Sequence, residues 1–229
     1  MKNAIFTLFL LHLFLFGFSQ DLSYDVRGTY QRAIVKEKLN EAKTMIDINP
    51  GYPSSWISGY ISVGVLATCN GIVMQALGAN DTLSNEQMNI LKKADIGTDI
   101  VIDIKYYKEN SLDEGDIQTI NFSFTVIPET EATYPGGHQL LRQYLKENAI
   151  DKISQSAATQ FQLATVLFSI DENGEVIDSR ISMSSGNEEI DDLLIQAIKK
   201  MQKWEPAKDS NGINVRQEFE FSVGTMIGC

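Results

Sequence analysis

Apolar and polar residues alternate with a period of two along two stretches in the first half of the chain, residues 100–104 and 117–126. This alternation predicts strands with one buried face. Residues 57–68 are rich in β-branched and apolar side chains and predict a third strand. The pair Asn70-Gly71 follows, and because it favours a type I′ turn, residues 72–77 are expected to pair back as a hairpin.

Two short helices are predicted among these strands. Residues 37–46 place their apolar side chains on one side, and the following Asn-Pro-Gly-Tyr-Pro segment must end that helix because proline lacks a backbone donor. Ser84 and Gln87 have the spacing of a capping box, so a second helix is expected to begin there and run to about Ala94.

The second half of the chain predicts helix, hairpin, helix and strand. Apolar residues cluster at helical spacing after Gly137, and residues 161–170 and 176–183 flank a turn with an Asn-Gly pair. A strongly amphipathic helix follows, with its apolar stripe at Ile190, Leu193, Leu194, Ala197, Ile198 and Met201. Residues 215–223 predict a last strand.

The chain therefore divides into three parts, and its expected fold class is α+β. Residues 1–20 are a leader, residues 21–130 a β-rich and sandwich-like domain, and residues 131–229 a second domain of two helices and three antiparallel strands. The boundary is expected in the segment 128–133, between the strand that ends at Val126 and the Tyr-Pro-Gly-Gly that opens the second domain.

The leader has the features of a secretory signal peptide. Lys2 precedes an apolar run over residues 4–18, and Gly17 and Ser19 supply small residues near its end. Cleavage is expected after Ser19 or Gln20. The alternative is an uncleaved inner-membrane anchor, but a spanning helix needs about 20 apolar residues and this run is shorter.

Composition narrows the range of partners. Hydrophobic residues make up 43% of the 229 residues, enough for a packed core, and the net charge of −11 argues against nucleic acid as a partner. The two cysteines are Cys69 and Cys229. Export would permit a disulfide between them, and a buried Cys69 with a free Cys229 is the alternative reading.

No motif for catalysis, metal binding or a cofactor occurs. The chain lacks His-Glu-x-x-His, Cys-x-x-Cys, Gly-x-Ser-x-Gly and the phosphate-binding Gly-x-x-x-x-Gly-Lys. His138 is read as an exposed residue at a helix start, the loop Asp171–Gly174 as a hairpin turn rather than a calcium loop, and Trp204 as core. The acidic residues Glu188, Glu189, Asp191 and Asp192 suit a helix N-terminus. We therefore expect a non-enzymatic protein without a small-molecule substrate.

The second domain carries four motifs in a characteristic order. They are Tyr134-Pro135-Gly136-Gly137, Gly174-Glu175-Val176-Ile177 with Ser184-Ser185-Gly186, the segment Met201-Gln202-Lys203-Trp204-Glu205-Pro206-Ala207, and the closing stretch Gly212 to Val223. Together they resemble the C-terminal domain of TonB, in the form found in Bacteroidetes. Residues 81–106 also resemble part of a β-sandwich module of gliding-motility and type IX secretion proteins.

The TonB resemblance implies a binding mode. Two helices would pack on a three-stranded antiparallel sheet, and a short extended peptide of a TonB-dependent outer-membrane receptor would pair with the exposed last strand. The expected partner-binding residues are Arg216, Gln217, Glu218, Phe219, Glu220, Phe221, Ser222 and Val223. Phe219, Phe221 and Val223 are expected to face the core, and Gln217 and Ser222 to lie nearer the surface.

The chain departs from an energy-transducing TonB in two respects. It has 5 prolines rather than a proline-rich spacer, and its apolar leader resembles a cleavable one. The expected function is therefore a periplasmic, envelope-associated binding module that supports transmembrane transport. The alternative is a periplasmic scaffold or assembly protein, including a homodimer, that engages no receptor. Inner-membrane anchoring is expected if the leader is retained.

Overall fold

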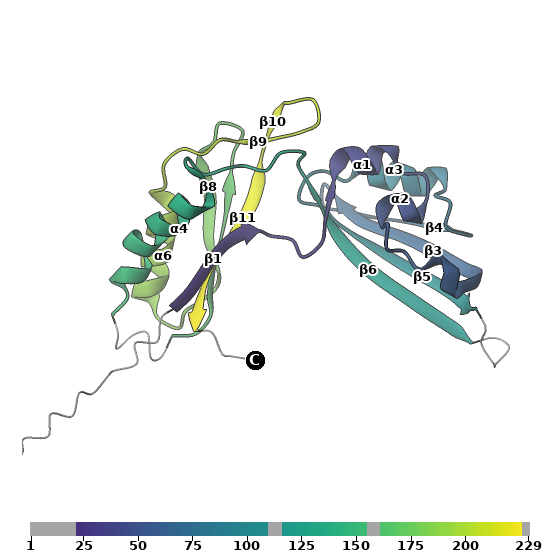
Figure 1. Ribbon diagram of the computed structural model, residues 1–229, viewed down its shortest axis with the longest axis horizontal. Helices are drawn as coiled ribbons and strands as arrows, with labels where there is room; N and C mark the ends of the chain where they lie inside the picture. Colours follow the sequence, from purple (N-terminus) through teal and green to yellow (C-terminus); the bar gives the residue numbers. More distant parts are fainter. Residues whose placement is uncertain (1–21, 110–115, 155–160, 226–229) are drawn as a thin grey trace, which may run out of the picture.

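The computed structural model describes residues 22–109, 116–154 and 161–225. These residues form two units, each with a hydrophobic core of its own. Figure 1 shows a sheet in each unit with helices packed on one of its faces. The fold is α+β, as the sequence predicts.

The first unit is built on a five-stranded sheet in the order β2-β6-β5-β3-β4. Its strands are β2 (Ala33–Val35), β3 (Ile57–Cys69), β4 (Ile72–Gly78), β5 (Asp99–Lys108) and β6 (Ile117–Ile127). All neighbours are antiparallel except β2 and β6, which run parallel. Asn70 and Gly71 have positive φ, so the predicted hairpin turn between β3 and β4 is confirmed.

Three helices cover one face of this sheet, as Figure 1 shows: α1 (Lys36–Glu41), α2 (Met45–Ile48) and α3 (Asn85–Lys93). A 3-10 turn, η1 (Ser54–Trp56), leads into β3. The single helix predicted over residues 37–46 is wrong, because Thr44 caps a new helix. The Thr44 hydroxyl accepts from the Asp47 amide, and the Asp47 carboxylate accepts from the Thr44 amide. The chain therefore restarts at α2 instead of continuing α1.

Gln87 fixes α3 to the sheet and begins that helix at the same time. The predicted capping box is present, since the Gln87 side chain accepts from the Ser84 amide at 2.8 Å. Its amide nitrogen also donates to the Val63 carbonyl oxygen at 2.7 Å, and the residue is fully buried. A buried amide costs free energy unless its hydrogen bonds are satisfied, and here both ends have a partner.

The second unit is built on a four-stranded antiparallel sheet in the order β1-β11-β7-β8. Its strands are β1 (Leu22–Gly28), β7 (Ala164–Ile170), β8 (Val176–Met183) and β11 (Gln217–Thr225). Helices α4 (Gly137–Asn148) and α6 (Glu188–Lys199) pack on one face (Figure 1). A 3-10 turn, η2 (Ile150–Lys152), follows α4, and the short strands β9 (Ala207–Lys208) and β10 (Asn214–Val215) pair with each other.

An aromatic cluster closes the core of the second unit. The Trp204 ring lies 5.2 Å from Phe219, 5.5 Å from Tyr134 and 6.1 Å from Phe168, measured between ring centroids. Trp204 is 4% exposed, which agrees with its reading as a core residue. Its backbone amide donates to the Gly174 carbonyl at 2.9 Å, so the turn between β7 and β8 is fastened to the end of the α6 segment.

The course of the chain differs from the predicted succession of domains. The strand β1, which precedes the first unit in the sequence, lies in the sheet of the second unit (purple beside yellow in Figure 1). The sheet therefore has four strands, where the sequence predicts three. The first unit is in effect inserted between β1 and the rest of the second unit, and the two cores divide between Val126 and Ala132.

Candidate functional site

The predicted binding strand β11 lies in the interior of its sheet. On one side it pairs with β7, from Gln217↔Ile170 to Val223↔Ala164. On the other side it pairs with β1 over seven residues, from Leu22↔Thr225 to Gly28↔Phe219. The expectation that the last strand is an exposed edge is therefore wrong for this structure. The reason is that β1 pairs with the backbone groups of β11 that would be unpaired if β11 were an edge strand.

The side chains of β11 alternate between the core and the outer face of the sheet. Phe219, Phe221 and Val223 are at most 5% exposed, so their predicted orientation is confirmed. Gln217 is also buried, at 4%, and its predicted place near the surface is wrong. The strand period of two puts Gln217 on the same face as Phe219. Ser222 is half-buried on the opposite face.

The outer face of β11 carries ion pairs to neighbouring strands. Glu220 accepts from Arg27 of β1 at 2.5 Å, and Glu218 accepts from Arg180 of β8 at 3.1 Å. Arg216, just before β11, contacts the Asp178 carboxylate at 2.8 Å. Exposed pairs of this kind contribute about 0–1 kcal/mol each, so they set register more than they add stability.

Helix α4 holds β1 from its other side. The Arg142 guanidinium donates to the Tyr24 carbonyl oxygen at 3.0 Å and stacks over the Tyr24 ring at 4.7 Å. Asp25 accepts from Arg142 and faces the His138 imidazole, each at 3.5 Å. His138 is exposed, as the sequence predicts. One arginine thus occupies part of the free edge of β1.

The opposite edge of the sheet, strand β8, is poorly shaped for pairing with another strand. Its register with β7 shifts between Leu167 and Ser169, and Asp178 has a positive φ of 51°. Asp178 and Arg180 place charges along the strand. Bulges and charges of this kind protect an edge from further pairing. Strand β11 differs from β7 and β8 because one of its neighbours, β1, comes from a distant part of the chain, ahead of the first unit.

The comparison with known families agrees with this geometry. Residues 163–223 match the family described as Gram-negative bacterial TonB protein C-terminal. Residues 163–223 of the second unit therefore belong to the TonB C-terminal domain family. The matched segment runs from just before β7 through β8 and α6 to β11, and β1 lies outside it. No curated protein and no solved structure matches the chain.

TonB C-terminal domains are associated with the cell envelope and with the receptors and other proteins found there. In the described ranges no helix is long and apolar enough to cross a bilayer. The same ranges contain no group of three or more His, Cys, Asp or Glu side chains placed to hold a metal ion. The predicted leader, residues 1–20, lies outside the described residues and stays a prediction.

The other residues singled out in the sequence fall into structural roles or remain untested. Asp171 accepts from the amides of Asn173 and Glu175, at 2.9 and 2.7 Å, as a hairpin turn requires. Asn187 caps α6, whose first turn holds the acidic residues. Cys69 is buried at the end of β3. Cys229 lies outside the described residues, so its pairing with Cys69 stays a prediction.

Sequence reasoning missed a chain of hydrogen bonds at the point where the two units join. The Tyr30 hydroxyl donates to Glu131 at 2.5 Å, and the Gln217 amide nitrogen donates to the second Glu131 oxygen at 2.9 Å. The Gln217 oxygen accepts from the Ala132 amide at 2.8 Å. These bonds connect the exit of β1 to the start of β11, and they explain why Gln217 can be buried.

Burial, together with the bond to Glu131, raises the pKa of the Tyr30 phenol to about 12. Since the phenol of the unfolded chain titrates near its ordinary pKa of 10.0, the folded chain holds this proton more tightly. The stability that neutral Tyr30 contributes is complete below pH 10 and is lost as pH rises toward 12. The wild type and Tyr30→Phe are titrated spectrophotometrically, and the difference between the two curves should show a phenolate step near pH 12. A step near pH 10 would contradict the hydrogen bond.

Proposed function

We propose that the TonB C-terminal domain binds an extended peptide of a TonB-dependent outer-membrane receptor by strand addition to β11, in place of β1. The protein would act without catalysis, in the periplasm, in support of transport across the outer membrane. The observation that carries the proposal is the β1–β11 ladder itself. It supports the view that β11 accepts a separate extended segment over seven of its nine residues, from Phe219 to Thr225.

Strand addition draws its affinity from backbone hydrogen bonds and its specificity from alternate side chains. Strand β1 indicates which side chains the site accepts. Leu22 and Val26 are buried against the core of the domain, whereas Asp25 and Arg27 are exposed. A peptide that replaces β1 would therefore carry apolar residues at alternate positions and tolerate charge between them.

The same observation favours a second candidate. If β1 never leaves β11, the domain presents no open strand to a receptor, and the protein is a periplasmic scaffold or assembly protein. The fastening of β1 by Arg142 and the bond between Tyr30 and Glu131 support this alternative. The two candidates differ in one physical property, which is whether β1 can be displaced.

A reversible lock between β1 and β11 tests this property. Asp25 and Ser222 face each other across the ladder. Opposed residues of an antiparallel pair have Cα atoms about 4.5–5.5 Å apart, within the range for a disulfide. In Asp25→Cys/Ser222→Cys, with Cys229→Ala to avoid mispairing, the oxidised protein should lose peptide binding and the reduced protein should regain it. Binding is measured by fluorescence anisotropy.

Two probes and one control make the result decisive. The probes are a synthetic peptide of the β1 sequence, Leu22–Gly28, and eight-residue peptides from the periplasmic segments of the host's TonB-dependent receptors. The control is Leu66→Cys/Gln75→Cys, a lock between β3 and β4 in the first unit, which should not affect binding. Equal binding by the oxidised and reduced forms would exclude β11 as the site. Binding of the β1 peptide without any receptor peptide would favour the scaffold.

A further inference from the structure

The sheet of the first unit has an open edge along most of β6. Strand β2 pairs with β6 only at residues 125–127, and no other described strand lies on that side of residues 117–124. The Thr125 amide donates to the Arg32 carbonyl at 2.8 Å, so it points away from β5. By the alternation of an antiparallel ladder, the backbone groups of Thr119, Asn121 and Ser123 point the same way. They are therefore available to another strand.

This edge lacks the usual protection against pairing. Residues 117–127 read Ile-Gln-Thr-Ile-Asn-Phe-Ser-Phe-Thr-Val-Ile, without a charged residue or a proline. Its register with β5 is continuous from Asp99↔Thr125 to Tyr107↔Ile117, without a bulge. Folded proteins commonly protect long edges with lysine, proline or bulges, because an open edge recruits other strands. The edge of β8 in the second unit has such features, and this edge has none.

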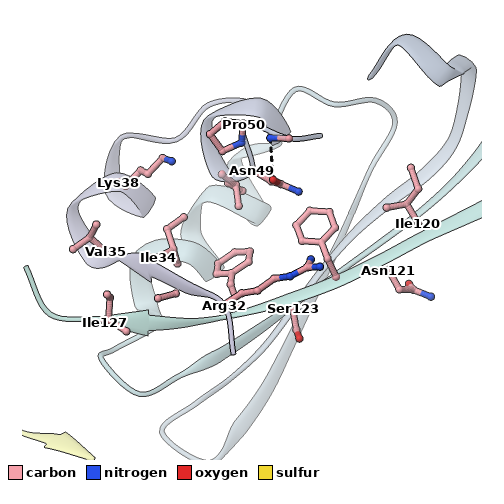
Figure 2. Close-up of a pocket in the computed structure, with 15 residues that line it drawn as sticks. Arg32, Ile34, Val35, Lys38, Asn49, Pro50, Ile120, Asn121, Ser123 and Ile127 are labelled. Carbon is pink, nitrogen blue, oxygen red and sulfur yellow. Dashed lines mark hydrogen bonds between the residues drawn. The ribbon is translucent and has the colours of Figure 1, made fainter. Parts of the chain in front are cut away.

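A pocket of about 670 Å³ lies directly beside the open edge (Figure 2). Apolar residues of β6, β2 and α2 line it, among them Phe122, Phe124, Ile34 and Ile48. Phe122, on the core face of β6, is buried, while its neighbours Asn121 and Ser123 are exposed. A strand paired with β6 would therefore turn alternate side chains into this pocket.

The charges at the pocket are all of one sign. Its only charged lining residues are Arg32 and Lys38, although the chain carries a net charge of −11. Figure 2 shows the Arg32 side chain running along β6 with its guanidinium group toward the middle of the pocket, and Lys38 on α1. Both side chains are exposed, and neither has an ion pair with any described residue. Two uncompensated cations beside an apolar pocket are complementary to an acidic ligand.

We propose that the first unit binds an extended acidic peptide by strand addition to β6. Its backbone pairs with Thr119, Asn121 and Ser123, an apolar side chain enters the pocket, and a carboxylate contacts Arg32 and Lys38. This site is separate from β11 and does not depend on the function proposed for the second unit. The protein would then hold two extended segments at once, one on each sheet.

The test uses the mature protein and two fluorescein-labelled peptides of eight residues. In one peptide threonine occupies every second position, and valine and glutamate take turns at the positions between, so that both face the pocket. The other peptide has lysine in place of glutamate. The wild type should bind the glutamate peptide at least tenfold more tightly than the lysine peptide. Arg32→Glu/Lys38→Glu should lower the affinity for the glutamate peptide at least tenfold and reverse the preference. Because both side chains are exposed and unpaired, this variant should keep its thermal stability.

A matched control and a backbone variant complete the experiment. Lys105→Glu/Lys108→Glu makes the same charge change on β5, away from the pocket, and should leave binding unchanged. Asn121→Pro removes a backbone donor that points to the open edge and not to β5, and should weaken binding at least tenfold. The oxidised β1–β11 lock should bind as the wild type does, since it closes the other site.

Three outcomes would overturn the proposal. The first is equal affinity of the wild type for the two peptides, and the second is no binding of the glutamate peptide. The third is a concentration-dependent dimer whose hydrogen-exchange protection maps to residues 117–124, because a second copy of the chain would then occupy the edge.

Discussion

Gly174→Ala is expected to destabilise the second unit by about 3 kcal/mol, which lowers its melting temperature by roughly 10–20 °C. Gly174 has φ of +85°, and a Cβ at this position would lie 2.1 Å from the Trp204 carbonyl oxygen. Neither group can move freely, since the Trp204 amide is bonded to Gly174 and its ring is packed among aromatic side chains. Thermal unfolding followed by tryptophan fluorescence measures the effect.

Gly212→Ala is the matched control, because the chain contains the same turn twice. Asp209 accepts from the amides of Asn211 and Ile213, as Asp171 does in the turn of Gly174. Gly212 has φ of +76°, but a Cβ added there would have nothing within 4 Å. We expect a loss of about 1 kcal/mol from the backbone conformation alone. Equal losses at the two glycines would show that the contact with Trp204 does not matter.

Val26→Ala is expected to strengthen peptide binding to β11 by roughly 30-fold. Val26 is 6% exposed and opposes Phe221, so its truncation removes about 2 kcal/mol from the docking of β1. The docking free energy that β1 loses appears as a gain in affinity for a peptide that competes with β1, at about tenfold for each 1.4 kcal/mol. The β1 peptide, titrated into wild type and variant by fluorescence anisotropy, gives the two affinities.

The control for general destabilisation is Val63→Ala. Val63 is fully buried in the core of the first unit, so its truncation should cost a similar free energy without touching β1. Its peptide affinity should equal that of the wild type. If Val26→Ala left the affinity unchanged as well, the competition between β1 and the peptide would be refuted.

Local signals account for what the sequence predicts well. Asn70-Gly71 forms its hairpin turn and Ser84 with Gln87 caps its helix, because each motif satisfies backbone groups within a few residues of itself. The stripe from Ile190 to Met201 likewise predicts the buried face of α6. The strands of the TonB C-terminal domain follow from patterns of the same short range.

The pairing of β1 could not be predicted in this way. Leu22, Tyr24 and Val26 alternate with polar residues, so the segment does carry a strand pattern. Its partner, however, lies almost the whole chain away, and alternation says nothing about which strand a segment joins. The buried Gln217 is a related case, because its partners Glu131 and Ala132 come from the junction between the units.

The insertion of the first unit between β1 and α4 imposes an order on folding. During synthesis residues 22–28 are made before the first unit, yet the strand that they join, residues 217–225, is made after it. Contacts between residues so far apart in the sequence form slowly, because closing the long loop between them costs conformational entropy before the contacts can stabilise the chain. The strands of the first unit follow one another in the sequence, with no strand of the second unit between them. This unit can therefore fold before β1 has a strand to pair with. Completion of the second sheet is then the final step, and until that moment β11 is an open strand.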